Sequence, residues 1–217
     1  MKKILALILV LSCVFAMGSC KLFKKNVKDQ APEFDREAVA AVQAKIDAST
    51  PESATVTVTY NSTLGTLNSE YNVFYNVDGT ASVAYSYEKF NSPADASADF
   101  KTTYSGETVV NADGTLASNP EGIASVEALT FDINLDPSKI YDATLSSGVL
   151  EVIVKAENTQ AVLGVNIGAD VKVIVTTGSL GVTSVAISYT ANSGSVEIVA
   201  TYTYYVAPEE EPEEGNE

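Results

Sequence analysis

The chain contains no histidine and no tryptophan, and its two cysteines, Cys13 and Cys20, both lie in the first twenty residues. Without histidine the sequence cannot supply a Ser-His-Asp or Cys-His catalytic group, or the commonest side-chain ligand of zinc and copper. It also lacks a Gly-rich phosphate loop and a dinucleotide-binding fingerprint. The sequence therefore predicts no enzyme, no cofactor and no metal site. Paired carboxylates and a Ser-Lys pair are the catalytic chemistries that the composition leaves open.

Basic residues are also few: 13 lysines and arginines stand against 28 acidic residues in 217. All acidic residues follow Cys20, whereas Lys2 and Lys3 precede it, so a chain cut before Cys20 would keep 11 basic residues and a net charge near −17. Binding to phosphates needs clustered lysine and arginine, and we therefore expect no nucleic-acid partner. The acidity is typical of a surface that keeps a protein soluble.

The first twenty residues have the organisation of a secretion signal. A basic start, Met1-Lys2-Lys3, precedes an apolar run over residues 4–16, and small residues follow up to Cys20. The run is too short for a transmembrane helix and has the length of the hydrophobic region of a signal peptide. Met17-Gly18-Ser19-Cys20 resembles the bacterial lipobox, in which signal peptidase II cuts immediately before the cysteine. It departs from the commonest pattern at its first and third positions, where leucine and a glycine or alanine are usual.

The lipobox resemblance implies a signal peptide at residues 1–19 and a lipid attached to Cys20. The protein would then be an extracytoplasmic lipoprotein anchored in the cell membrane or the outer membrane. Each buried methylene of the acyl chains contributes about 0.8 kcal/mol, so several chains hold such a protein at the membrane. Two alternatives remain open: cleavage before Cys13, and a signal peptide that is removed without lipidation.

Two polar segments flank the part of the chain that is expected to fold. Residues 20–32 are predicted to be a flexible tether, whose four lysines outweigh Asp29 and favour anionic lipid head groups. Residues 207–217 contain six glutamates and are predicted to be a disordered acidic tail. Residues 33–206 are therefore predicted to form a single β-rich domain, long enough for one core.

From residue 34 to about residue 48, apolar residues recur with the spacing of a helix. The positions four residues apart are Phe34, Ala38, Val42 and Ile46. This pattern predicts an amphipathic helix with one apolar face. We expect Val42 and Ile46 to face a sheet and Gln43 to face water. The strand residues expected to contact the helix are Val58, Val73 and Val83.

After residue 51, apolar and polar residues alternate strictly, which is typical of half-buried antiparallel strands. The alternating runs are 55–60, 71–76, 82–87, 129–136, 171–176, 182–189 and 195–205. Turn sequences separate them, and Asn-x-Asp-Gly-Thr occurs twice, at residues 76–80 and 111–115. Because the flanking residues differ, we interpret the repetition as reused turn chemistry. The pattern indicates about ten strands.

Residues 157–164 interrupt the strands and predict a short helical turn that ends at Gly164. The order of one amphipathic helix, a strand meander, a short helix and closing strands resembles the LolA/LppX-like superfamily of bacterial envelope lipoproteins and lipoprotein carriers. The likeness is carried by the helix 34–46, the turn 161–164 and the meander 171–205. It implies an α+β, mostly β fold, in which a curved antiparallel sheet of about ten strands packs on an N-terminal amphipathic helix and can enclose a lipid-sized cavity. No site residue transfers from it. The structural alternative is a β-sandwich.

Two groups of residues are candidate sites. Asp132, Asn134 and Asp136 have the spacing of the start of a calcium loop. Pro137 and Ala143, however, stand where an EF-hand needs glycine and glutamate, so we interpret the group as the wet face of a strand. The second group consists of the strand-face tyrosines, which either fill a core without tryptophan or line a ligand cleft. They are Tyr71, Tyr75, Tyr85, Tyr87, Tyr189, Tyr202 and Tyr204.

These observations lead to two hypotheses for the function. The first is a non-catalytic, membrane-anchored lipoprotein that binds or carries an apolar ligand such as lipid, for which no ligand-binding residue is identified. The second is a surface structural or interaction lipoprotein without a small-molecule ligand, which a broad exposed apolar patch would favour. An enzyme would need two carboxylates, or a serine and a lysine, converging in a cleft.

Overall fold

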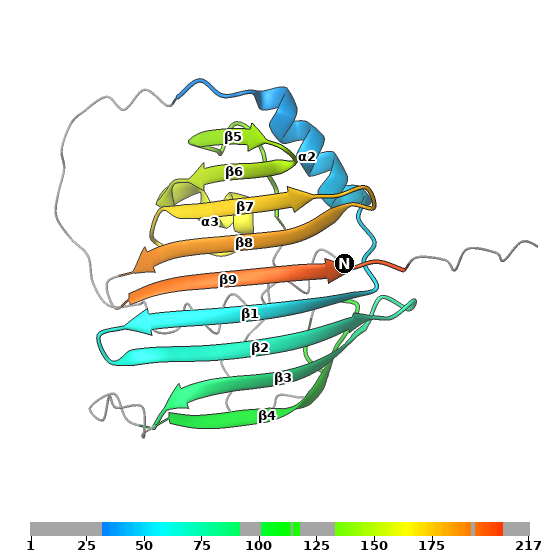
Figure 1. Cartoon of the computed structure of the whole chain (residues 1–217), viewed down its shortest axis with the longest axis vertical. Helices are drawn as coiled ribbons and strands as arrows, with labels where there is room; N and C mark the ends of the chain where they lie inside the picture. Colours follow the sequence, from blue (N-terminus) through cyan, green and yellow to red (C-terminus); the bar gives the residue numbers. More distant parts are fainter. Residues whose placement is uncertain (1–31, 92–100, 114, 118–132, 192–193, 206–217) are drawn as a thin grey trace, which may run out of the picture.

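A computed structural model describes residues 32–91, 101–113, 115–117, 133–191 and 194–205. The strands of this part of the chain form one open antiparallel sheet in the order β4-β3-β2-β1-β9-β8-β7-β6-β5 (Figure 1). The prediction of a mostly β fold is therefore confirmed. The β-sandwich alternative is wrong, because the described strands belong to one sheet rather than two.

The sheet consists of two meanders, β1–β4 and β5–β9, which are joined where β1 pairs with β9. The strands are β1 (Ser53–Ser62), β2 (Gly65–Tyr75), β3 (Ala81–Phe90), β4 (Lys101–Val110), β5 (Asp142–Ser146), β6 (Val149–Val154), β7 (Val171–Thr177), β8 (Val182–Ala191) and β9 (Gly194–Thr203). The helices are α2 (Arg36–Ala48), the 3-10 turn η2 (Ala156–Asn158) and α3 (Thr159–Leu163). The described strands thus number nine, not about ten.

The N-terminal helix α2 forms where the sequence predicts it. The Asp35 side chain caps its start by accepting a hydrogen bond from the Ala38 N–H at 3.0 Å, and Val39 and Val42 are buried. Its main sheet contacts are with β5 and β7 (Figure 1). The predicted position against the strands of Val58, Val73 and Val83 is therefore wrong. Periodicity identifies the apolar face of a helix but not the strands that cover it.

Gln43 does not face water as predicted. It is half-buried, its Oε1 accepts from the Leu135 N–H at 2.8 Å, and its Nε2 donates to the Ile133 carbonyl at 3.2 Å. The Asn134 N–H donates to the Val162 carbonyl at 2.8 Å. The predicted strand at 129–136 is thus wrong over its described residues, 133–136. Ile133 and Leu135 are buried and Asn134 is exposed, so the burial alternates as it would in a strand. The backbone of these residues, however, bonds to the Gln43 side chain and to α3 instead of to a partner strand.

The two Asn-x-Asp-Gly-Thr segments make the same side-chain contacts, so the same turn chemistry occurs at both places. In each, the aspartate Oδ1 accepts from the N–H and the hydroxyl of the threonine two residues later, at 2.7–3.0 Å. The asparagine amide also donates to that threonine Oγ1 at 3.0 Å in both. The turns lie close together, because a Cβ on Gly79 would be 3.5 Å from the Ala112 Cβ.

The predicted short helical turn is also present as η2 and α3. Gly164 ends α3 with a φ of 72°, and its N–H donates to the Gln160 carbonyl. Several predicted features lie outside the described residues and stay predictions. They are the signal peptide at 1–19, the lipid attachment at Cys20, residues 20–31 of the tether, Asp132 and the acidic tail at 207–217.

Candidate ligand-binding face

The alternation of each strand sends its side chains to two faces of the sheet. On one of these faces, the inner face, buried residues of neighbouring strands lie opposite one another. Val56 on β1, for example, lies opposite Tyr71 on β2 and Ala200 on β9, and all three are buried. The other, outer face carries mostly threonine, serine, asparagine and charged residues, such as Thr57 opposite Glu70.

The inner face changes its chemistry from one half of the sheet to the other. On β6–β8 it is mainly aliphatic, with Leu150, Val152, Val154, Val171, Val173, Val175, Val185 and Ile187. On β1–β4 and β9 it carries a set of tyrosines that we call the tyrosine face: Tyr60, Tyr71, Tyr75, Tyr85, Tyr87, Tyr104 and Tyr202. None of the described helices makes its main sheet contacts with β1–β4 (Figure 1). The described helices therefore pack mainly against the aliphatic half of the sheet.

Aromatic rings form a continuous surface over β3 and β4. Tyr87 stacks on Tyr104 with ring centroids 5.2 Å apart and planes at 15°, and Tyr85 lies 6.1 Å from Tyr87. Opposite Tyr85, β4 carries Gly106, where an added Cβ would lie 2.6 Å from the Tyr85 Oη. The glycine thus leaves room for the Tyr85 ring to lie across β4.

Three hydroxyls of the tyrosine face, those of Tyr71, Tyr75 and Tyr202, have a raised pKa and are uncharged at neutral pH. Burial, together with the nearby Tyr204, raises the pKa of Tyr75 to about 12. Burial also raises the pKa of Tyr71 and Tyr202 far above the ordinary tyrosine value. The face therefore offers aromatic area and neutral hydroxyl donors, which suit an apolar or weakly polar molecule rather than an ion.

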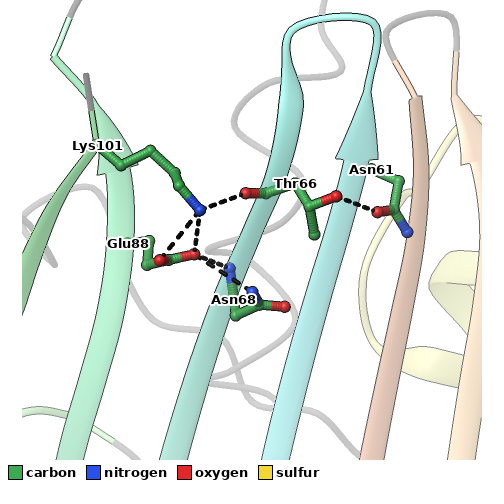
Figure 2. Close-up of polar contacts among 5 residues, drawn as sticks. All are labelled: Asn61, Thr66, Asn68, Glu88 and Lys101. Carbon is green, nitrogen blue, oxygen red and sulfur yellow. Dashed lines mark hydrogen bonds and ion pairs between the residues drawn. The ribbon is translucent and has the colours of Figure 1, made fainter. Parts of the chain in front are cut away.

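A polar cluster holds one end of the tyrosine-bearing half together on the outer face (Figure 2). The Lys101 Nζ donates to both Glu88 carboxylate oxygens at 3.1 Å and to the Thr66 carbonyl at 2.9 Å. A Glu88 oxygen accepts from the Asn68 N–H at 2.7 Å, and the Thr66 hydroxyl donates to the Asn61 Oδ1 at 2.7 Å. We call Glu88 and Lys101 the clamp.

The clamp replaces missing strand pairing. The β2–β3 ladder ends at Ser69 opposite Tyr87, so the backbone groups of residues 66 and 68 have no β3 partner. The clamp satisfies them with a carboxylate and an ammonium group. Partial burial raises the pKa of Glu88, but the hydrogen bonds from Asn68 and Lys101 outweigh it and leave the pKa below its usual value. This cluster could not be predicted from the sequence, because charges on an outer strand face are usually solvated.

The outer face has a hollow of about 630 Å³. Asp170, Lys172, Ser188 and Glu197 line it, and these include the carboxylate, lysine and serine side chains that an enzymatic site would need. Ser188 lies directly opposite Lys172. The Lys172 Nζ, however, is paired with the Glu151 carboxylate at 2.7 Å. Asp170 is bound to the Lys155 Nζ and the Ala156 N–H, each at 3.0 Å. The group has the contacts of a structural ion-pair network.

The calcium-loop residues are not brought together as ligands. The Asp136 carboxylate accepts from the Ser138 N–H at 2.8 Å, and Asn134 is exposed. In the described part of the chain, no three side chains of the types that ligate metals come together. No helix in that part is long and apolar enough to cross a membrane.

Comparison with known proteins finds similar solved structures at low sequence identity. No family model matches the sequence, and no curated protein matches it. LprF from Mycobacterium bovis has a similar structure, with 12% identity, coverage of 80% of this chain and 96% of the other, and a TM-score of 0.40. An outer membrane lipoprotein-sorting protein domain from Vibrio parahaemolyticus is similar with 8% identity, coverage of 80% and 96%, and a TM-score of 0.30.

Proposed function

We propose that the protein is a membrane-anchored, extracytoplasmic lipoprotein without catalytic activity, and that it binds an apolar ligand such as lipid on the tyrosine face. The observation that carries the proposal is the division of the inner face. The β6–β8 half is mainly aliphatic, whereas the half on β1–β4 and β9 adds seven tyrosines to its buried aliphatic residues. Tyrosine combines a large apolar area with a hydroxyl that can hydrogen-bond a ligand, which favours binding over core packing alone.

The dimensions of the tyrosine face agree with a lipid chain. Neighbouring strands lie about 4.8 Å apart, so the face measures about 14 Å from β1 to β4. One acyl chain takes up half of a bilayer core that is about 30 Å thick, and therefore about 15 Å. A single chain laid across the four strands would lose most of its contact with water, and each methylene buried would contribute about 0.8 kcal/mol.

Energy transfer from tyrosine provides a direct test, because the chain has eleven tyrosines and no tryptophan. The probe is the methyl ester of cis-parinaric acid, a neutral polyene that absorbs where tyrosine emits. Titration of the full chain at a fixed detergent concentration should quench tyrosine emission with saturation at a defined stoichiometry. Tyr85→Ala on the inner face should weaken binding, whereas Phe74→Ala on the outer face should not. Quenching that never saturates and is equal in all three proteins would count against the proposal.

The anchor at Cys20 has its own test. Cys20→Ala should remove the protein from lipid labelling and leave it released or unprocessed, because the lipidated cysteine is the proposed attachment site. Cys13→Ala is the matched control and should label as the wild type does. Loss of labelling in Cys13→Ala alone would move the cleavage site to Cys13.

One observation favours the second candidate, a surface interaction lipoprotein without a small-molecule ligand. The outer face has a hollow of about 420 Å³ over β2–β4, beside which Phe74 is 55% and Val109 is 38% exposed. Exposed apolar side chains in such a hollow are typical of a protein contact. A photo-crosslinking residue placed at position 74 in cells should then capture a protein partner, whereas one at position 57 on the same face should not.

A further inference from the structure

The inner face contains one polar atom whose state is unusual. Tyr71 is 2% exposed, and its Oη has no hydrogen-bond partner, the one such buried side-chain atom among the described residues. Ser69, two residues away on the same strand face, is near enough to lower the pKa of Tyr71, but its hydroxyl does not reach hydrogen-bonding geometry. Burial is the larger effect and keeps the Tyr71 hydroxyl protonated, so a proton is available for donation.

A second tyrosine hydroxyl, just after β9, has a partner within the chain. The Tyr204 hydroxyl donates to the Val182 carbonyl at 2.7 Å. A buried hydroxyl without a partner destabilises the folded chain, and folded proteins rarely retain one. Phenylalanine at position 71 would fill the same space without this cost. The tyrosine at this position therefore points to a partner that is not part of the described chain.

The surroundings of Tyr71 restrict the chemistry of that partner. Its cross-strand neighbours are Val56 on β1 and Tyr85 on β3, and Val73 and Ser69 flank it on its own strand face. None of these residues carries a positive charge, so a carboxylate or phosphate would be bound without a counter-ion in an apolar setting. A neutral carbonyl oxygen accepts a hydrogen bond without that penalty.

We propose that the Tyr71 hydroxyl donates a hydrogen bond to a neutral carbonyl oxygen of an otherwise apolar ligand on the tyrosine face. This inference rests on the proposed function and narrows it: the ligand class is an ester- or amide-linked acyl chain rather than a bare hydrocarbon or a free fatty acid. The apolar face holds the chain, and Tyr71 fixes the position of the carbonyl along it.

Two probes of matched length, methyl palmitate and heptadecane, test the proposal on the full chain. The detergent-solubilised protein is incubated with each probe, separated from free probe, and the bound amount per chain is measured by gas chromatography. Tyr71→Phe should lower the retention of methyl palmitate about 3- to 10-fold and leave heptadecane unchanged. Partition into detergent is the same for both proteins and cancels in the comparison. Tyr204→Phe, which loses a hydroxyl already bound within the protein, should retain both probes as the wild type does.

Thermal unfolding without probe separates the remaining outcomes. Tyr71→Phe should keep or raise the melting temperature, whereas Tyr204→Phe should lower it. Equal retention of methyl palmitate by wild type and Tyr71→Phe would overturn the inference and leave the proposed function standing. A melting temperature that falls in Tyr71→Phe as it does in Tyr204→Phe would show a partner within the protein and also overturn it. Retention of neither probe by the wild type would overturn the proposed function itself.

Discussion

At the scale of single residues, side chains that bind backbone groups hold the helices and turns to the sheet. Ser49 accepts from the Val182 N–H at 3.0 Å, and Tyr204 donates to the carbonyl of the same residue. Gln43 does the same for residues 133 and 135. In each case a buried or half-buried peptide group receives a partner that no neighbouring strand provides. Such residues look like ordinary surface positions in the sequence.

Gln43→Leu should lower the free energy of unfolding by about 1–3 kcal/mol, because the Leu135 N–H and the Ile133 carbonyl lose their partner. Chemical denaturation measures this change. Ala44→Leu, at the next and exposed position of α2, should change it by less than about 0.5 kcal/mol. Equal midpoints for the two variants would mean that water replaces the Gln43 amide.

The buried tyrosines predict a loss of stability at alkaline pH. The pKa of Tyr75 is raised from 10.0 to about 12 on folding, so its neutral form is favoured in the folded chain. The contribution is fully present below pH 10 and is lost as the pH rises toward 12. Absorbance of tyrosinate should show Tyr71, Tyr75 and Tyr202 ionising only with unfolding. A single titration at the ordinary tyrosine pKa would contradict the buried assignment.

At the scale of elements, the clamp fixes β3 to β2 beyond the end of their ladder. Glu88→Ala should raise the hydrogen-exchange rate of the Asn68 amide and lower the free energy of unfolding by up to about 1 kcal/mol, since the pair is partly exposed. The pKa of Glu88 is depressed, so this contribution is present above the ordinary glutamate pKa and is lost as the pH falls below it. Lys172→Ala, which breaks another outer-face pair, is the matched control and should leave the Asn68 amide unchanged.

Local sequence patterns predict the individual helices and strands well, but they do not predict which elements pack or pair with one another. The six alternating runs on β1–β3 and β7–β9 correspond to strands because their inner positions are apolar and their outer positions polar. None of the predicted runs covers β4, β5 or β6. On β4 the inner positions Tyr104, Gly106 and Thr108 break that contrast. It wrongly extended a strand through residue 136, because extended coil alternates in burial as a strand does. The pairing of β1 with β9 and the tyrosine face could not be predicted, since both depend on contacts between distant parts of the chain.

At the scale of the whole molecule, the described sheet ends close to the predicted acidic tail. Deleting residues 208–217 removes no described residue and should change the melting temperature by less than about 3 °C. Deleting residues 202–217 also removes Tyr202, which pairs with Ala54, and the Tyr204 hydrogen bond. That longer deletion should lower the melting temperature clearly. A large loss from the shorter deletion would show that the tail packs against the domain.

The position of β9 has a consequence for how the protein is made. The ribosome synthesises β9 after every other described strand, yet β9 lies between β1 and β8 in the middle of the sheet. Until residues 194–203 emerge, the two meanders have no shared hydrogen bonds and cannot close into one sheet. Contacts between the two ends of a chain also form slowly. A chain exported N-terminus first would thus stay unfolded, and fit to pass through a translocation channel, until its last strand had arrived.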